Sequence, residues 1–474
     1  MVVIKNQYFI FILFLFFTTK LFSVTIPDGL AQEISHIPLN KSNYSIHIQE
    51  INAKYPIVSW NTHQKRTPAS VMKLLTTYSA LLELGFNYRW ETKFFYTGKI
   101  QRGILKGDLY VKASGDPTLK TEDIYSIVSQ VQSLGIKRIR GNIIIDRTLF
   151  KVTSKNSSGF DKNVYSPYNA MPDAIMFNKR KSTFCITPHS KRAKIKKDIP
   201  DKSYKIVNKL RMVNGSCRKG RSWPKVKIKT NSSSRSTIYL TGKLSKRCGK
   251  RTICKVVSMP HRAFYYALRD ELKSVGIAVT GILKLKKVPN KAKYLFSHYS
   301  EPLENVISTI AKKSDNLMAR QLMLTLGSKR YAAPSTTYKS RNAIEKILNK
   351  YYILEKGTTF IDNGSGLSRS SKVTAKSLAN LLDHAIKNYG QRWMDTLSVA
   401  GIDGTLKHRF SNSLIYGRAW MKTGTIKGVK NIAGYVEGAS GQRYVVVVLV
   451  NDKYSRKYGA KLANSVIEWV GSSL

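Results

Sequence analysis

The segments with strand character lie near the two ends of this chain, and that arrangement strongly constrains its fold. Residues 43–60 alternate apolar and polar side chains in NYSIHIQ and PIVSW, which predicts two strands. Residues 416–451 contain YGRAWMKTGTI, NIAGYVEG and QRYVVVVLVND, which predict an antiparallel meander with glycine-containing turns. If one sheet contains strands from both ends of the chain, the intervening residues are an insertion in the domain that holds the sheet. We therefore expect an α/β sandwich, an antiparallel sheet flanked by helices, with a β-rich inserted region at residues 86–297.

The first long helix is predicted in PASVMKLLTTYSALLELG, from Pro68 to Gly85. Thr67 is a candidate N-cap, Pro68 suits the first helical position, and Gly85 suits the C-terminal end. Ser70 and Lys73 are three residues apart, so on a helix their side chains share one face. The pair therefore places a nucleophilic hydroxyl beside an amine that can take its proton.

The Ser-Lys spacing alone does not identify a catalytic site, because it recurs at Ser216 with Lys219 and at Ser222 with Lys225. Other motifs must support it. Residues 314–316, Ser-Asp-Asn, form a short polar joint between two predicted helices, PLENVISTIAKK and NLMARQLMLTLG. Ser-Asp-Asn is also a good helix cap, so the joint alone is weak evidence for a site. Residues 422–424, Lys-Thr-Gly, lie on a predicted strand, where the glycine leaves room for another backbone to approach.

The N-terminal sequence has the form of a secretory signal peptide. Lys5 precedes an apolar run from Tyr8 to Phe17, and Ser23 is a candidate cleavage position. We expect residues 1–23 to be removed, so that the mature protein begins near Val24 and is periplasmic or extracellular. An uncleaved membrane anchor is the alternative.

The charge of the chain is extreme, with a formal net charge of +52. Residues 179–255 contain 25 Lys or Arg and only two acids, Asp198 and Asp201. Such a segment attracts an anionic wall polymer or an anionic membrane surface. Aromatic residues are sparse within it and no nucleic-acid module signature is present, so we expect no specific nucleic-acid partner. A basic bias shared by a whole proteome would explain the charge without any function.

All four cysteines fall in the same basic segment. In an exported protein they are expected to form disulfides rather than a metal site, because no Cys-x-x-Cys spacing is present. Three pairings are open, and the sequence does not choose among them, although Cys217 with Cys248 is slightly preferred. We expect no free thiol from this set: Cys185, Cys217, Cys248 and Cys254.

The three polar motifs together carry a resemblance. Ser70-Val71-Met72-Lys73, Ser314-Asp315-Asn316 and Lys422-Thr423-Gly424 are similar, in order, to the motif set of penicillin-binding proteins and β-lactamases. The 244 positions from Ser70 to Ser314 exceed what a β-lactamase needs. The chain thus resembles the penicillin-binding protein 4 type of D-alanyl-D-alanine carboxypeptidase/endopeptidase, a penicillin-recognising serine peptidase. Other similar stretches are ASGDPTL, YNAMPDAIMFN, KKSDN, DNGSGLSR and GVKNIAGY.

The resemblance implies a domain plan. A penicillin-binding domain with the β-lactamase/transpeptidase-like fold would comprise residues 24–85 and 298–474. The inserted region, residues 86–297, would hold two nested domains and include the basic segment 179–255. The resemblance does not account for that basic segment.

The resemblance also implies a reaction. Ser70 would attack the carbonyl between two D-alanines, Lys73 would take its proton, and Ser314 would relay a proton to the leaving amine. Asn316 would hold the substrate amide. An oxyanion would lie between the backbone N–H groups of Ser70 and Thr425.

The remaining substrate contacts follow from the third motif. Lys422 and Thr423 would meet the terminal carboxylate, and the cationic Lys422 would help keep Lys73 neutral. The substrate backbone would pair with the strand that carries Gly424. The family uses a carboxylate of the inserted region for the free amino end of a wall peptide, and Asp173 is the nearest candidate here. No metal and no organic cofactor is implied.

Two other functions stay open from the sequence. A β-lactamase shares the acylation chemistry, but no motif places a water-activating carboxylate near Ser70. A non-enzymatic envelope protein that binds polyanions would retain the fold without turnover. Within the peptidase hypothesis, the partners are peptidoglycan stem peptides, with β-lactams as inhibitors. Removal of a terminal D-alanine and cleavage of a D-Ala-meso-diaminopimelate cross-link are not distinguished.

Overall fold

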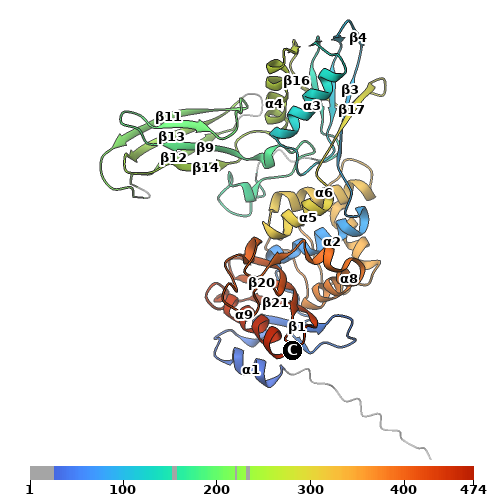
Figure 1. The fold of residues 1–474 in the computed structure, drawn as a ribbon, viewed down its shortest axis with the longest axis vertical. Helices are drawn as coiled ribbons and strands as arrows, with labels where there is room; N and C mark the ends of the chain where they lie inside the picture. The colour runs from blue at the N-terminus through green and yellow to red at the C-terminus, as the bar shows by residue number, and fades with distance from the viewer. Residues whose placement is uncertain (1–25, 152–156, 219–220, 231–234) are drawn as a thin grey trace, which may run out of the picture.

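The computed structural model describes residues 26–151, 157–218, 221–230 and 235–474 (Figure 1). The predicted signal peptide at residues 1–23 and the predicted mature start at Val24 lie outside the described residues. Within the described ranges, none of the helices combines the length and the apolar character needed to span a bilayer.

A six-stranded sheet forms the lower part of the molecule in Figure 1, in the order β18-β19-β20-β21-β1-β2. Every neighbouring pair in it is antiparallel. The predicted sharing of one sheet by strands from both chain ends is confirmed. The strands are β1 (Tyr44–Glu50), β2 (Val58–Trp60), β18 (Ser398–Val399), β19 (Ala419–Ile426), β20 (Val429–Glu437) and β21 (Arg443–Asn451).

Helices cover both faces of this sheet, which explains the long apolar run in β21. Val446 and Val448 pack in one core with helices α1 (Asp28–Ser35) and α9 (Ser455–Ser473). Val445 and Val447 point the opposite way and pack in a second core with helices α2 (Met72–Leu84) and α8 (Ala375–Met394). Because successive side chains of a strand face opposite sides, a strand between two helical layers must be apolar throughout.

The helix predicted from Pro68 begins later than expected. A short 3-10 turn, η2 (Ala69–Val71), comes first, and α2 starts at Met72. The prediction that Thr67 is the N-cap is wrong. Its hydroxyl instead accepts a hydrogen bond from the Lys372 amine at 3.1 Å. At the other end, Gly85 closes α2 in the left-handed region, with φ of 75°, as predicted.

Three further helices pack beside α2. The two predicted around the Ser-Asp-Asn joint are confirmed, and the buried side chains of α2 lie in the same core with all three. Figure 1 shows them as the middle layer of the molecule. They are α5 (Leu303–Lys312), α6 (Asn316–Arg330) and α7 (Thr337–Asn349).

The upper part of the molecule is built from the predicted insertion. It contains a five-stranded sheet, β16-β8-β6-β3-β17, and a four-stranded sheet, β15-β7-β5-β4, around one core with helices α3 (Thr121–Ser133) and α4 (Pro260–Ser274). The strands are β3 (Glu91–Tyr96), β4 (Lys99–Gln101), β5 (Ile104–Lys106), β6 (Leu109–Lys112), β7 (Arg138–Ile139), β8 (Ile143–Asp146), β15 (Ala278–Val279), β16 (Leu283–Leu285) and β17 (Lys293–Tyr299).

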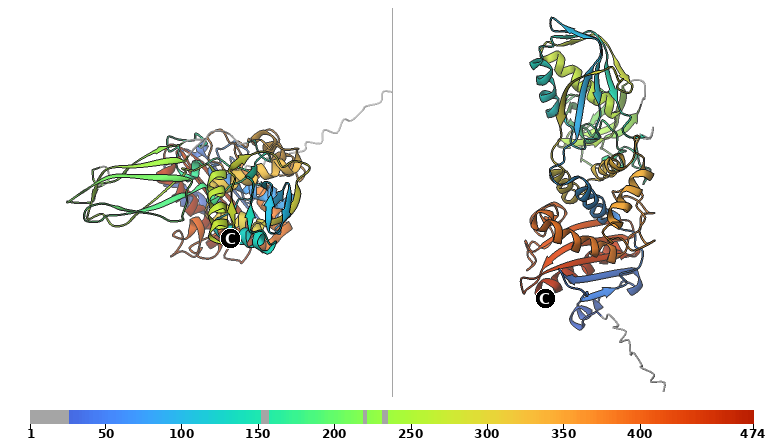
Figure 2. Two further views of the ribbon diagram at one scale, coloured as in Figure 1. Left: turned by 90° about the horizontal axis from the view of Figure 1, so that it is seen from above. Right: turned by 90° about the vertical axis from the view of Figure 1, so that its right-hand side faces the viewer.

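Most of the basic segment forms a separate projection, residues 182–255, which we call the basic arm (Figures 1 and 2). The polar, glycine-, proline- and lysine-rich sequence from Asn156 predicts a loop-rich module. This prediction is wrong in the arm, because two three-stranded sheets, β10-β9-β14 and β11-β13-β12, enclose a core of their own. The strands are β9 (Ser182–Thr187), β10 (Lys194–Lys197), β11 (Tyr204–Val213), β12 (Lys225–Lys229), β13 (Ser236–Ser245) and β14 (Arg251–Lys255).

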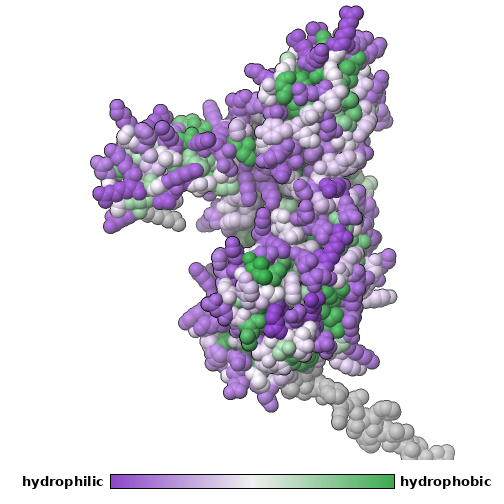
Figure 3. Space-filling model, in the orientation of Figure 1, coloured by the Kyte–Doolittle hydropathy of each residue, from purple (hydrophilic) through white to green (hydrophobic). Residues whose placement is uncertain are grey.

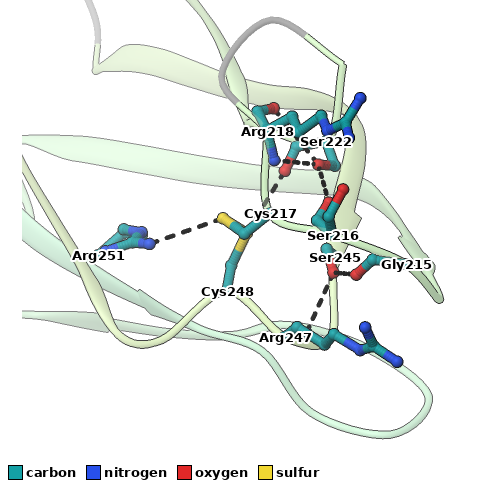
Figure 4. Close-up of a disulfide and its surroundings, with 9 residues drawn as sticks. All are labelled: Gly215, Ser216, Cys217, Arg218, Ser222, Ser245, Arg247, Cys248 and Arg251. Atoms are coloured by element: carbon teal, nitrogen blue, oxygen red, sulfur yellow. Dashed lines mark hydrogen bonds between the residues drawn. A yellow bond between two sulfur atoms is a disulfide. The ribbon is translucent and has the colours of Figure 1, made fainter.

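One disulfide joins Cys217 to Cys248 in the arm, the pairing that was preferred (Figure 4). Cys185 and Cys254 are free, so the expectation of no free thiol is wrong. The sheet register explains why. Cys185 is opposite Thr252, and Cys254 is opposite Thr183. The two thiols are therefore diagonal neighbours, and diagonal positions lie about 7–8 Å apart, beyond the usual reach of a disulfide.

Candidate active site

Ser70 lies in the η2 turn at the entrance to α2, with its hydroxyl partly exposed, while Lys73 is only 1% exposed. The Lys73 amine is 2.9 Å from the Ser70 hydroxyl, 2.6 Å from the Asn316 side-chain oxygen and 2.6 Å from the Ser365 carbonyl oxygen. An ammonium would donate to all three oxygens. A neutral amine has two N–H donors and one lone pair, so it can donate to Asn316 and Ser365 and accept from Ser70.

The surroundings of Lys73 favour the neutral amine. Burial lowers the pKa of Lys73 well below its usual value, and the nearby charges of Lys422 and Arg320 lower it further. The Asp315 carboxylate acts in the opposite direction but does not outweigh them. A lysine in this state can serve as a general base for the serine that it contacts.

The Ser-Asp-Asn joint is both a helix cap and part of this cluster. Asp315 accepts a hydrogen bond from the Met318 backbone N–H at 3.0 Å and so caps α6. Ser314 adopts a left-handed conformation, with φ of 52°. This turn directs the Asn316 side chain to Lys73 and brings the Ser314 hydroxyl within 3.1 Å of the Lys422 amine.

Lys422 is fully buried on β19, and burial lowers its pKa to about 7. Its amine also donates to the Thr423 carbonyl oxygen at 2.8 Å. The Thr423 hydroxyl is partly exposed and donates to the Thr405 hydroxyl at 2.8 Å. Two buried amines, on α2 and β19, therefore stand behind a row of hydroxyl groups that solvent can reach.

Gly424 allows β19 to touch the turn that carries Ser70. A Cβ atom at this position would lie 2.8 Å from the Pro68 carbonyl oxygen and 2.9 Å from the Ser70 nitrogen. These are closer than van der Waals contacts permit, and both neighbours are backbone atoms. The close approach expected at this glycine is therefore present.

The edge of β19 beyond Met421 is open. β18 pairs with β19 only at Met421 and Trp420, and no other described strand occupies this edge. The open stretch runs through residues 422–426, and Thr425 within it is exposed. An extended peptide can add to such an edge through backbone hydrogen bonds.

The structure brings together six of the predicted residues in two hydrogen-bonded groups, Thr423 through its backbone carbonyl and the other five through their side chains, but not Asp173. That residue is 1% exposed, and both of its carboxylate oxygens pair with the Arg147 guanidinium. The Ile175 backbone N–H donates to the same carboxylate at 3.0 Å. A carboxylate that is buried and paired in this way offers no free oxygen to the amino end of a substrate. The six are Ser70, Lys73, Ser314, Asn316, Lys422 and Thr423.

Two supporting groups had no role assigned from the sequence. The first is the Ser365 carbonyl, which lies in DNGSGLSR and accepts from Lys73. The second is Asn431, whose side-chain amide donates to the carbonyl oxygens of Thr67 and Pro68, both at 2.9 Å. Asn431 thereby fixes the backbone ahead of Ser70. The signal for it was a buried polar residue in the otherwise apolar strand NIAGYVEG.

The site contains no evident metal ligands. Among the described residues, no group of three or more His, Cys, Asp or Glu side chains is placed to hold a metal ion. The side chains that the cluster presents are hydroxyl, amine and amide groups.

Comparison with known proteins gives a consistent result. The chain is 25% identical to D-alanyl-D-alanine carboxypeptidase DacB of Haemophilus influenzae over 415 residues, which cover 86% of this chain and 85% of that protein. It is 27% identical to a D-alanyl-D-alanine carboxypeptidase of Actinomadura sp. (strain R39) over 403 residues, 82% of this chain and 73% of that one.

A solved structure agrees in fold. Penicillin binding protein 4 (dacB) from Haemophilus influenzae superposes with a TM-score of 0.79 at 24% identity, covering 93% of this chain and 98% of that one. The family model for the D-Ala-D-Ala carboxypeptidase 3 (S13) family matches residues 28–471. The predicted resemblance to penicillin-binding protein 4 is thus confirmed, and this chain belongs to the D-Ala-D-Ala carboxypeptidase 3 (S13) family.

Proposed function

We propose that this chain is a serine D,D-peptidase that hydrolyses the D-Ala-D-Ala bond of peptidoglycan stem peptides, D-Ala-meso-diaminopimelate cross-links, or both. The observation that carries the proposal is the buried Lys73 amine, which lies 2.9 Å from the Ser70 hydroxyl with a lowered pKa. The family and the carboxypeptidases that match the chain support it.

Acylation begins when Lys73 takes the proton of Ser70 and the Ser70 oxygen attacks the carbonyl carbon between two D-alanines. Negative charge then develops on the carbonyl oxygen, where the backbone N–H groups of Ser70 and Thr425 stabilise it. Ser314 passes a proton to the leaving amine. Asn316 holds the substrate amide, and water later releases the acyl group from Ser70.

The third motif orients the substrate. Lys422 has a pKa of about 7, so a substrate carboxylate beside it favours the charged ammonium. Its proximity to the Ser314 hydroxyl, at 3.1 Å, links carboxylate binding to the proton relay. The open edge of β19 accepts the substrate backbone as an added strand, and Thr423 supplies a hydroxyl to the same carboxylate.

The alternatives lack matching features. A β-lactamase needs a carboxylate that activates water against the acyl-enzyme, and in the described structure no acidic side chain is hydrogen-bonded to Ser70 or Lys73. Binding of polyanions alone does not require the buried Lys73 amine to contact the Ser70 hydroxyl.

Fluorescent penicillin tests the nucleophile. A β-lactam should acylate Ser70 and stay attached, because the ring-opened amine remains tethered and obstructs water. Ser70→Ala should abolish covalent labelling without loss of folding, and Lys73→Ala should slow labelling by about 100-fold or more. Ser222→Ala is the matched control, since Ser222 has the same spacing to a lysine but donates its hydroxyl to the Ser216 carbonyl at 2.8 Å. Labelling of Ser70→Ala would exclude the proposed nucleophile.

The bond that is cut needs a separate experiment. Purified cross-linked peptidoglycan should be digested and its fragments weighed by mass spectrometry. Loss of one alanine from stem peptides indicates carboxypeptidase activity, and conversion of dimers to monomers indicates endopeptidase activity. If the enzyme labels with penicillin but yields neither product, the substrate assignment is wrong.

We also propose the domain plan and the location. A penicillin-binding domain of residues 24–85 and 298–474, with residues 86–297 inserted, is supported by the sheets: the six-stranded sheet takes no strand from the insertion, and only the last two residues of β17 (Lys293–Tyr299) extend past the boundary at residue 297. A periplasmic or extracellular location is supported by a cell-wall substrate. The intact mass of the exported protein should correspond to a start near Val24, and retention of residue 1 would contradict cleavage.

A further inference from the structure

One sheet of the basic arm presents a face on which exposed cations are the most common side chains. In the sheet β11-β13-β12, the side chains of Ile238, Leu240 and Leu244 point inward to the arm's core. Residues at the alternate positions point outward. Seven of these outward side chains are cations, and all are exposed. We call this set the basic face: Lys205, Lys209, Arg211, Lys225, Lys227, Lys229 and Lys243.

No acid compensates this charge. The sequence has no Asp or Glu between Asp201 and Asp270. None of the seven cations forms an ion pair with any described residue, whereas surface arginines elsewhere pair with carboxylates, as Arg330 does with Glu83 and Arg392 with Glu304. The face therefore keeps its full positive potential toward solvent.

The cations lie on all three strands of the sheet rather than in a single row. Lys225, Lys227 and Lys229 repeat at every second residue of β12, about 6.7 Å apart along the strand. β11 lies two strands away, about 9.6 Å across the sheet, and carries three more cations. On the central strand, Lys243 is directly opposite Arg211, a like-charged pair that destabilises the isolated sheet. A planar set of anions would satisfy both rows together.

We propose that the basic face binds an anionic lipid surface, and that this docking is separate from the peptidase site. Six of the seven cations are lysines, whose hydrated point charges suit diffuse attraction to many headgroups better than paired recognition of one phosphate. Apart from Tyr239, Val207 and Val213, the outward side chains are polar, so the face offers few apolar wedges or stacking platforms for inserted bases or acyl chains. If the basic face binds lipid headgroups through charge alone, without inserting apolar side chains, salt must weaken the binding strongly.

The arrangement of the molecule permits this docking. The arm projects sideways from the body, and its surface in Figure 3 is largely hydrophilic. The residues of the proposed peptidase site lie in α2, α6, β19 and the joint before α6, none of which belongs to the arm. Lysines on edge strands also hinder edge-to-edge association, but that role does not explain Lys243 on the central strand.

The test uses vesicles of phosphatidylcholine with and without phosphatidylglycerol, and measures co-sedimentation of the full mature chain at low and high salt. The variant Lys225→Gln/Lys227→Gln/Lys229→Gln removes three cations of the face. Its control, Lys284→Gln/Lys286→Gln/Lys287→Gln, removes three exposed cations outside the arm. Each lysine near an anionic surface contributes roughly fivefold to binding, so the arm variant should bind roughly 100-fold more weakly than the parent and the control should change little.

Three results would overturn the inference: equal loss in both variants, equal binding to vesicles without phosphatidylglycerol, or binding that high salt leaves unchanged. Tighter binding to purified sacculi or to DNA than to the anionic vesicles would also reject a lipid partner. Penicillin labelling of all variants shows that the peptidase site is folded, and a thermal melt of each variant checks that the arm is folded. Because labelling reports on Ser70 and sedimentation on the arm, failure of one proposal is distinguishable from failure of the other.

Discussion

Replacing Gly424 by alanine would test whether β19 and the Ser70 turn act as one unit. The new Cβ atom would lie 2.8 Å from the Pro68 carbonyl oxygen, 2.9 Å from the Ser70 nitrogen and 3.0 Å from the Val71 nitrogen. Ordinary contacts of a Cβ atom begin at 3.4 Å, so all three are short by 0.4 Å or more. All three neighbours are backbone atoms, which cannot rotate away. β19 must therefore move back from the turn.

The size of the effect follows from this displacement. Overpacking of a close contact costs about 1–3 kcal/mol, which lowers the melting temperature by roughly 2–12 °C in a domain of this size. A shift of several tenths of an ångström separates Lys422 and the Thr425 N–H from Ser70. Misplacement on the scale of 1 Å costs on the order of 100-fold in rate, so acylation should slow by about 10- to 100-fold.

The assay is the second-order rate of labelling by fluorescent penicillin, measured beside a thermal melt. Gly249→Ala is the control, because a Cβ at Gly249 meets nothing within 4 Å and its backbone is not in the left-handed region. The control should label and melt like the parent. If Gly424→Ala also labels at the parent rate with an unchanged melting temperature, the direct contact between β19 and the nucleophile's turn is refuted.

Three further outcomes are expected. Arg320→Met removes a charge that lowers the pKa of Lys73, so that pKa should rise. The rate of acylation, which increases with pH as Lys73 loses its proton, should then increase at a higher pH than in the parent, and an unchanged pH profile would contradict this. Cys217→Ala/Cys248→Ala opens a loop of 31 residues and should lower the free energy of unfolding by about 2–4 kcal/mol, measurable in denaturant. A thiol reagent should label Cys185 and Cys254 in the denatured, unreduced protein, and mass analysis that finds neither would contradict their free state.

Local patterns predicted the elements that build the penicillin-binding fold. The run QRYVVVVLVND predicts a strand by composition alone, and its burial on both faces follows from the helices that cover both sides of the sheet. The basic arm contains the same kind of strand signal. Val226 and Ile228 alternate with lysines in KVKIK, a two-residue period that identifies a half-buried strand despite the high charge.

Features that depend on contacts distant in sequence could not be predicted. Ala69 has a φ of 46°, and this conformation delays the start of α2, yet nothing in its neighbours specifies it. The turn instead packs against Gly424, more than 350 residues later. Asp173 was a reasonable candidate for a substrate contact by composition, but its partner Arg147 comes from another part of the insertion. Only the folded chain reveals that this carboxylate is already paired.

The joint before α6, Ser314-Asp315-Asn316, is both a helix cap and part of the candidate active site. Asp315 caps α6 and also meets the Lys179 amine from the insertion at 3.1 Å. A partly exposed ion pair of this kind contributes about 0–1 kcal/mol, whereas a cap contributes about 1 kcal/mol and fixes the backbone itself. The cap is therefore the stronger determinant of the left-handed turn at Ser314. That turn sends Ser314 to Lys422 and Asn316 to Lys73, so the helix cap is the element that joins the two buried amines into one site.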